Sequence, residues 1–202
     1  MTRDLHLTGD DDADRLLSDD DFALLTGMLL DQQVPMETAF AGPAKLRDRL
    51  GDLDAAAIAT MDPDAFQAAF AEKAQQLRQG DPREEATQIG PQIHRVHLDR
   101  IQGFVERAAA DGARVVIGGG PNDELGGLYF RPTLIADAKP GSEILTAEVF
   151  GPVLAMQTFS SDEEAVEMAN NTEFGLAAVV VCGDRERAQR LTKNLVAGTI
   201  WV

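Results

Sequence analysis

An acidic and an aromatic side chain stand two positions apart in a turn-forming segment in the second half of the chain. The segment reads Ala147-Glu148-Val149-Phe150-Gly151-Pro152-Val153. One carboxylate can accept hydrogen bonds from two adjacent hydroxyl groups of a sugar, and an aromatic ring can restrict the position of a flat ligand ring beside it. Glu148 and Phe150 are therefore the first candidates for a ligand site. The alternative is an exposed acid and a core aromatic residue that flank a Gly-Pro turn.

Two other groups of reactive side chains give weaker indications. Cys182, the one cysteine of the chain, follows the apolar residues 179–181 and has no neighbouring histidine. This pattern predicts a structural thiol in a buried strand rather than a nucleophile. His94 and His97 have the spacing of one helix face, with Asp99 close by, but they lack a third firm metal ligand. We therefore expect no metal site.

Two further patterns are expected to be structural. The glycine triplet at residues 118–120 is followed by Pro121 rather than by the helix of a dinucleotide-binding fingerprint, so it predicts a hairpin or loop. Arg95, Arg100 and Arg107 stand among acidic residues and are expected to form a solvated helix face.

The elements that position these side chains alternate between strands and helices after residue 80. Hydrophobic periodicity predicts helices over residues 98–110, 162–170 and 185–195, and strands over residues 114–117, 128–136, 154–159, 177–182 and 198–202. Such alternation predicts an α/β fold with a parallel or mixed sheet and covering helices.

The first third of the chain has a different pattern. Apolar residues recur at three- and four-residue intervals over residues 21–30 and 55–70, which predicts an all-α helical segment. Helix starts are expected at Ser18, Pro35 and Asp62-Pro63, because Ser and Asp cap helices and Pro suits a first turn. The boundary between the helical segment (residues 1–73) and the α/β part (residues 74–202) falls inside a continuous helical pattern.

From residue 74 onward the chain resembles the aldehyde dehydrogenase family. Besides the Glu148 segment, the shared motifs are Gly80-Asp81-Pro82, Thr87-Gln88-Ile89-Gly90-Pro91, Gly112-Ala113, Phe130-Arg131-Pro132-Thr133, Ala169-Asn170 and Gly198-Thr199-Ile200-Trp201-Val202. The resemblance implies the later part of that family's catalytic domain, a mixed sheet with covering helices. It also implies a parent enzyme that oxidises an aldehyde to a carboxylic acid with NAD or NADP.

The resemblance gives two residues a role at the cofactor. Glu148 would accept hydrogen bonds from the hydroxyl groups of the nicotinamide ribose, and Phe150 would place its ring against the nicotinamide. The family also needs a nucleophilic cysteine, a glutamate base, an asparagine for the oxyanion and a dinucleotide-binding domain, and none has a matching position here. We expect NAD or NADP binding in the parent family, and we expect this chain alone to be catalytically inactive.

Residues 5–73 resemble the opening of a helix-hairpin-helix base-excision DNA glycosylase-like protein. The residues that carry this likeness are Phe22-Ala23-Leu24-Leu25, Leu29-Leu30-Asp31-Gln32-Gln33 and Met36-Glu37-Thr38-Ala39. The likeness stops before the hairpin that grips phosphate and before the catalytic aspartate. Gln32-Gln33 could face DNA, but a polar cap on an amphipathic helix is the commoner role. The two resemblances together predict a fusion of two incomplete proteins.

Charge and composition limit the partners. The net charge is −16, with 16 acidic against 6 basic side chains in residues 1–73 and 18 against 12 in residues 74–202. DNA binding draws on a surplus of lysine and arginine, so DNA is not an expected partner. No apolar stretch approaches a membrane span of about 18 residues, and the first residues lack a secretory signal pattern, which predicts a cytoplasmic protein.

Two alternatives to the dehydrogenase fragment stay open. One is a DNA-binding, base-excision-repair-like helical protein that uses the Gln32-Gln33 segment. The other is a non-enzymatic association module, because the strand start at residues 199–202 would expose an edge through which the chain can self-associate.

Overall fold

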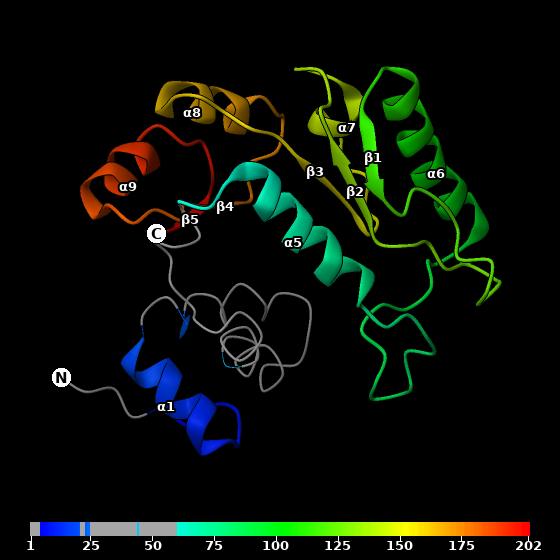
Figure 1. The fold of residues 1–202 in the computed structure, drawn as a ribbon, viewed down its shortest axis with the longest axis horizontal. Coiled ribbons are helices and arrows are strands. Elements are labelled where there is room, and N and C mark those ends of the chain that lie inside the picture. Colours follow the sequence, from blue (N-terminus) through cyan, green and yellow to red (C-terminus); the bar gives the residue numbers. More distant parts are fainter. Residues whose placement is uncertain (1–4, 21–22, 25–43, 45–59) are drawn as a thin grey trace. The chain divides into compact units, whose positions relative to one another are not determined.

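The computed structural model describes residues 5–20, 23–24, 44 and 60–202. The predictions for Pro35, for Gln32-Gln33 and for most of the helical pattern before residue 60 lie outside these residues. Two compact units make up the chain: Met1–Thr60, Val179–Thr192 and Ile200–Val202 form the first, and Met61–Ala178 and Lys193–Thr199 form the second (Figure 1). Within the described ranges, no helix combines the length and the apolar character that crossing a membrane requires.

In the first unit, helix α1 (Asp11–Asp19) begins at an aspartate cap. The Asp10 carboxylate accepts hydrogen bonds from the N–H groups of Asp12 and Ala13, and further acids in the first turn suit the positive end of the helix dipole. The helix start expected at Ser18 is wrong, because Asp10 has already opened the helix and Ser18 lies inside it. The Ser18 hydroxyl donates to the Asp14 carbonyl at 2.8 Å and accepts from the Leu5 N–H at 3.0 Å.

Asp14 attaches the chain before α1 to the helix. Its side chain is only 5% exposed. It accepts hydrogen bonds from the N–H groups of Leu7 (3.0 Å) and Thr8 (2.9 Å) and from the Thr8 hydroxyl (2.9 Å). Burial acts to raise the pKa of Asp14, but these hydrogen bonds to the charged form outweigh it, so the pKa is lowered from 3.8.

The second unit contains a three-stranded mixed sheet in the order β1-β2-β3. Strand β1 (Arg114–Ile117) pairs antiparallel with β2 (Thr133–Ala136), with a register shift between Val115 and Ile117. Strand β3 (Val153–Met156) pairs parallel with β2, and Thr133 lies opposite Val153. The predicted mixed sheet is confirmed. The strand expected over residues 128–136 starts later, because Phe130 forms only an isolated bridge with Pro121.

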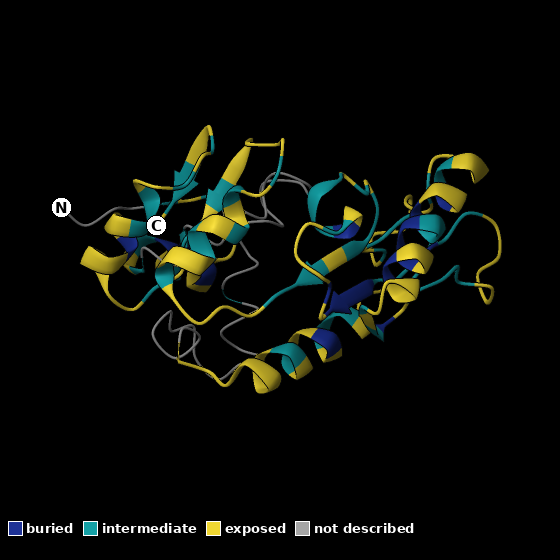
Figure 2. Cartoon of the chain, turned by 90° about the horizontal axis from the view of Figure 1, so that it is seen from above, coloured by how far each residue is buried: buried dark blue, intermediate teal, exposed yellow. Residues whose placement is uncertain are grey.

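Helices cover both faces of this sheet (Figure 1). All four residues of β2 are buried, as Figure 2 shows. On one face, Ile135 belongs to a core cluster with α6 (Arg95–Ala110) and the short helix α7 (Glu143–Thr146). On the other face, Leu134 packs with Ala71 of α5 (Pro63–Gln75). Because neighbouring side chains of a strand point to opposite faces, Leu134 and Ile135 enter different core clusters, and β2 is covered on both faces.

Helix α5 begins where the sequence predicts. Asp62 accepts hydrogen bonds from the N–H groups of Asp64 (3.0 Å) and Ala65 (3.1 Å), and Pro63 occupies the first turn. The helix continues without a break to Gln75, through the predicted boundary at residues 73/74.

Helix α8 (Asp162–Asn170) has the predicted bounds and organises the following loop. Ser161 accepts a hydrogen bond from the Glu164 N–H at 3.1 Å, which fixes the start of the helix. At its end, the Asn170 side chain donates to the Asn194 carbonyl and accepts from the Val196 N–H, both at 2.8 Å. Asn170 of the Ala169-Asn170 motif thus holds residues 194–196 in place.

The remaining elements are shorter than the sequence predicts. Strands β4 (Ala177–Val179) and β5 (Thr199–Trp201) form a two-stranded sheet. Helix α9 (Arg185–Thr192) follows Asp184, whose carboxylate accepts from the N–H groups of the first turn. Cys182 lies after β4 and is half-buried. The expectation of a buried strand at Cys182 is wrong, because β4 ends at Val179 and is itself partly exposed.

Candidate functional site

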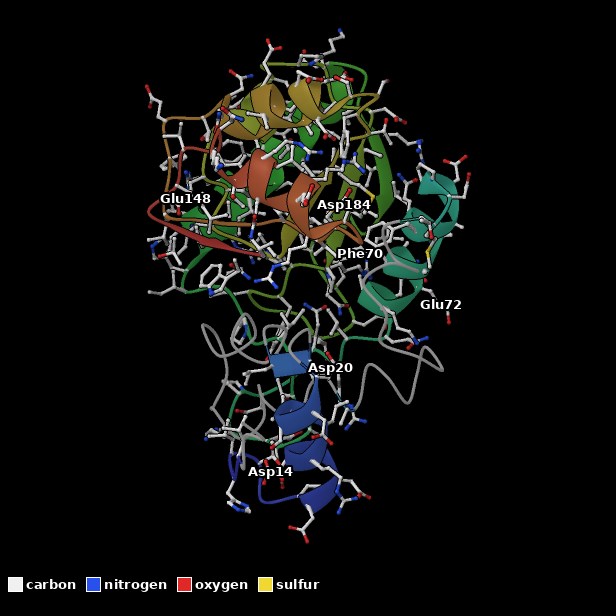
Figure 3. The ribbon with its side chains drawn as sticks, turned by 90° about the vertical axis from the view of Figure 1, so that its left-hand side faces the viewer. Asp14, Asp20, Phe70, Glu72, Glu148 and Asp184 are labelled. Carbon is white, nitrogen blue, oxygen red and sulfur yellow. The ribbon has the colours of Figure 1, made fainter. Side chains whose placement is uncertain are left out.

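The Glu148 and Phe150 side chains both reach solvent, in the loop between α7 and β3. The side chain of Phe150 is 70% exposed, and that of Glu148 is also exposed at the surface (Figure 3). The alternative of a core aromatic residue at Phe150 is therefore wrong. The Phe150 ring thus stands outside the core, two residues from an exposed carboxylate.

The backbone of this loop takes a conformation that few sequences allow. Phe150 has a φ of +59°, in the left-handed region that bulky residues rarely adopt. Gly151 lies so close to α6 that a Cβ atom there would be 2.5 Å from Cδ1 of Ile101. Only glycine permits this approach without displacing Ile101. The loop then enters the sheet, where the Pro152 carbonyl accepts from the Thr133 N–H at 2.8 Å.

Helix α6 anchors the loop through three consecutive carbonyl groups. The Arg100 guanidinium donates from Nη2 to the Glu148 carbonyl at 2.8 Å and from Nη1 to the Val149 carbonyl at 3.3 Å. Nε2 of His97 lies 2.7 Å from the Phe150 carbonyl oxygen. Because a carbonyl oxygen only accepts, the Nε2–H group of His97 is the donor in this hydrogen bond. The loop is thus held by its main chain. The Glu148 side chain is exposed, and the Phe150 ring is also mostly exposed but has an edge-on contact with the His97 ring.

The arginines of α6 are exposed, as expected, but they do more than face solvent. Arg100 and Arg107 lie over the Phe104 ring, with guanidinium carbons 5.0 and 5.1 Å from the ring centroid. Arg107 also pairs with Glu143 of α7 at 2.6 Å. The hydrogen bond to Glu143 raises the pKa of Arg107. One face of α6 therefore holds both α7 and the loop that follows it.

His94 and His97 both have hydrogen bonds within the fold. Nδ1 of His94 accepts the His97 N–H at 3.0 Å and caps α6. In the part of the chain that the structure describes, no group of three or more His, Cys, Asp or Glu side chains could hold a metal ion.

The glycine triplet forms the predicted loop. Gly118 and Gly119 have φ values of +71° and +89°, and the loop connects the antiparallel strands β1 and β2. The Gly119 N–H donates to the Thr133 hydroxyl at 2.8 Å. This N–H group is thus used inside the fold.

The residue types in this loop are those that the ribose end of a nicotinamide cofactor would require. Two adjacent ribose hydroxyls require a carboxylate that can accept both hydrogen bonds, and Glu148 supplies an exposed carboxylate on a fixed backbone. The planar nicotinamide requires an apolar wall, and the exposed Phe150 ring is two residues away. The glycine triplet at residues 118–120 supplies no free Gly119 N–H for a phosphate, because that group binds Thr133.

The sequence interpretation missed His97 and Arg100 as partners of the loop. A signal existed, because positions 97, 100, 104 and 107 lie on one face of a helix and combine cations with an aromatic ring. What the spacing could not indicate is the segment that this face contacts, which is about 50 residues away in the sequence.

Comparisons with known proteins place most of the chain in one family. The model of the aldehyde dehydrogenase family matches residues 60–202. Betaine aldehyde dehydrogenase of Sinorhizobium fredii is 42% identical over 141 residues, which is 69% of this chain and 29% of that protein. The chloroplastic betaine aldehyde dehydrogenase of Beta vulgaris is 42% identical over 127 residues, which is 62% of this chain and 25% of that protein.

Solved structures give the same relationship. Betaine aldehyde dehydrogenase from Staphylococcus aureus, in complex with NAD+, has a TM-score of 0.66 and 34% identity over 69% of this chain and 28% of that one. PnpE from Pseudomonas sp. WBC-3 has a TM-score of 0.65 and 36% identity, and the match covers 68% of this chain and 29% of PnpE.

The chain spans less than a third of the length of these relatives. The family match nevertheless takes in both faces of the mixed sheet, α6, and the loop that carries Glu148 and Phe150. By this match and by the fold that it shares with solved relatives, the chain belongs to the aldehyde dehydrogenase family.

Proposed function

We propose that Glu148 holds the nicotinamide ribose of NAD or NADP and that Phe150 fixes the position of the nicotinamide ring. The two residues would do so as part of a catalytic domain that oxidises an aldehyde to a carboxylic acid. One observation carries this proposal. The carbonyl groups of the loop bind α6, whereas its acidic and aromatic side chains remain exposed.

The cofactor, when bound, accepts the hydride that leaves the substrate. The contribution of this chain is orientation. A carboxylate that accepts from both ribose hydroxyls fixes one end of the cofactor, and an aromatic wall limits the rotation of the ring attached to it. Because the Glu148 backbone is held by Arg100, little conformational freedom is lost on binding.

Two relatives support the choice of substrate class and cofactor. The proteins of Sinorhizobium fredii and Staphylococcus aureus are betaine aldehyde dehydrogenases, and the second was crystallised with NAD+. An aldehyde and a nicotinamide cofactor are therefore the proposed ligands of the enzyme to which these residues correspond.

The 202-residue polypeptide by itself is proposed to be inactive. It has no position that matches the nucleophile, the base or the cofactor domain of the family, and its single Cys182 follows β4 far in sequence from the Glu148 loop. The purified chain should form no NADH from an aldehyde and NAD+. Turnover that is lost in Glu148→Ala would overturn this part of the proposal.

A graft tests the role of Glu148 directly. Residues 60–202 replace the matching segment of the Sinorhizobium fredii enzyme, and NADH formation is measured for the graft, for Glu148→Ala and for Glu167→Ala. Glu167 is an exposed acid on α8 and serves as the matched control. Loss of hydrogen bonds to a charged group costs about 1.5–3 kcal/mol, so Glu148→Ala should raise the KM for NAD+ by about tenfold or more. Equal values for the two variants would refute the assignment.

For the first third of the chain, we propose the glycosylase-like origin without DNA binding. The surplus of acidic over basic side chains in residues 1–73 opposes contact with phosphates. A labelled duplex at low ionic strength should therefore show no shift with this protein. A salt-dependent shift would favour the base-excision-repair alternative.

We also propose the division into residues 1–73 and 74–202, and the fusion that it implies. Sequencing of the source DNA across this junction would test both.

Self-association in the cytoplasm is the remaining proposal. Leu176 and Val196, next to β4 and β5 in the sequence, are 84% and 73% exposed. Exposed apolar side chains near a short two-stranded sheet favour contact with another chain. Light scattering should then give a mass above 21.7 kDa. A monomer at all concentrations would remove this proposal.

A further inference from the structure

We propose that His97 and Arg100 are positioning residues that hold the backbone of residues 148–150 so that the side chains of Glu148 and Phe150 face the cofactor together. This inference rests on the proposed function of Glu148 and Phe150 and adds the device that sets their geometry. His97 and Arg100 act through the loop and make no contact with the ligand in this role.

The geometry that carries the inference is the series of three acceptors. The carbonyl groups of three successive residues, Glu148, Val149 and Phe150, all bind side chains of one helix. Neighbouring carbonyl groups of an extended chain point in opposite directions, so a regular strand could not present all three to α6. The left-handed φ of +59° at Phe150 breaks that regularity. Such a conformation persists only where its surroundings hold it.

Both donors are themselves fixed before any ligand binds. His97 and Arg100 are one turn apart on α6. The next residue after each, Leu98 and Ile101 respectively, is buried and fixes the helix in the core. The Arg100 guanidinium rests on the Phe104 ring, and its planar fork reaches two carbonyl groups at once. The His97 ring meets the Phe150 ring edge-on, with centroids 6.4 Å apart. The same imidazole therefore contacts both the carbonyl group and the side chain of Phe150.

The affinity for the cofactor should depend on the fraction of molecules in which the loop is anchored. If the loop leaves its anchored conformation part of the time, the apparent Kd for the cofactor rises by the inverse of the anchored fraction. One hydrogen bond of ordinary net strength corresponds to a change of about fivefold in such an equilibrium. Removing either donor should weaken cofactor binding by up to about that factor while Glu148 and Phe150 stay unchanged.

The test uses two proteins: the 202-residue chain, labelled with 13C and 15N, and the graft described above. Backbone carbonyl signals of residues 148–150 in the labelled chain report the anchoring, and the KM for NAD+ of the graft carrying the same variants reports binding, because this chain has no position that matches the family's cofactor domain. The variants are His97→Ala, His97→Gln, Arg100→Ala and Arg100→Lys. Arg95→Ala is the matched control, because Arg95 is an exposed arginine of the same helix that donates to a carbonyl elsewhere, that of Gly127, at 3.2 Å.

The expected result is a change confined to the loop. His97→Ala and Arg100→Ala shift the carbonyl signals of residues 148–150, and in the graft they raise the KM for NAD+ by up to about fivefold. His97→Gln restores the signal of Phe150, because an amide N–H replaces the imidazole N–H. Arg100→Lys restores one of the two carbonyl contacts at most, because an ammonium lacks the fork. Arg95→Ala leaves the loop signals unchanged.

Two different failures can be told apart. If the carbonyl signals are the same in His97→Ala and Arg100→Ala as in Arg95→Ala, the positioning role is refuted. If those signals change as expected but the KM for NAD+ of the graft is unchanged in these variants and in Glu148→Ala, the anchoring stands and its proposed purpose, cofactor binding, is refuted.

Discussion

Substitution of Gly151 by alanine should destabilise the second unit through one identifiable clash. The added Cβ would lie 2.5 Å from Cδ1, 2.9 Å from Cγ1 and 3.2 Å from Cγ2 of Ile101. Ile101 is completely buried at the centre of the α6 core, so it cannot move into solvent. Insertion of a methyl group into a packed core costs about 1–3 kcal/mol. The backbone angle of Gly151 adds no left-handed strain to this cost, since its φ is not positive.

The assay is urea unfolding with a double-mutant cycle. Ile101→Val alone should cost about 0.5–1.5 kcal/mol, because a buried methyl group is lost. In the double variant Gly151→Ala/Ile101→Val, the atom closest to the new Cβ is absent. The double variant should therefore be more stable than the sum of the single changes predicts, with a coupling of about 1 kcal/mol.

Gly90→Ala provides the matched control. A Cβ at Gly90 would come no closer than 3.6 Å to any atom, that atom being Cβ of Pro82, and the φ of Gly90 is not positive. At such a position, alanine is expected to be neutral or to stabilise by about 0.4–1 kcal/mol through the unfolded chain. If Gly151→Ala is no more destabilising than Gly90→Ala, or if the cycle shows no coupling with Ile101, the packing argument for the loop is refuted.

Two further predictions concern buried polar groups. The pKa of Asp14 is lowered in the folded chain, so its hydrogen bonds with Leu7 and Thr8 contribute stability above pH 3.8 that is lost as the pH falls through the folded value. Acid titration of α1 by circular dichroism should show this loss below about pH 4, and Asp14→Asn should abolish the pH dependence. Thr133→Val keeps the shape of a side chain that is only 4% exposed but leaves the Gly119 N–H without its acceptor. It should cost about 1–3 kcal/mol in denaturant unfolding, and a cost near zero would contradict the assigned bond.

Local chemistry explains which parts of the fold the sequence could predict. The start of α5 follows from Asp62, whose side chain binds backbone N–H groups two and three residues later, and from Pro63 in the first turn. The bounds of α8 follow from hydrophobic periodicity, and the structure adds the Ser161 cap. Ser18 shows the limit of the same rule, because an earlier aspartate, Asp10, took the capping position. The late start of β2 depends on pairing across the sheet, which periodicity within one segment does not contain.

The candidate site divides in the same way. The motif around Glu148 and Phe150 could be predicted because it is contiguous and shared with a known family. The contacts of His97 and Arg100 with this loop could not, since they join segments about 50 residues apart and end on carbonyl groups, which every residue has. A sequence pattern identifies side chains, and here the decisive acceptors belong to the main chain.

The measurement that tests the central claim most directly is a crystal structure of the grafted enzyme with NAD+ bound. The proposed function predicts that both hydroxyl groups of the nicotinamide ribose lie within about 3.2 Å of the Glu148 carboxylate and that the Phe150 ring lies against the nicotinamide. A ribose held by other residues, with Glu148 and Phe150 left in solvent, would contradict it.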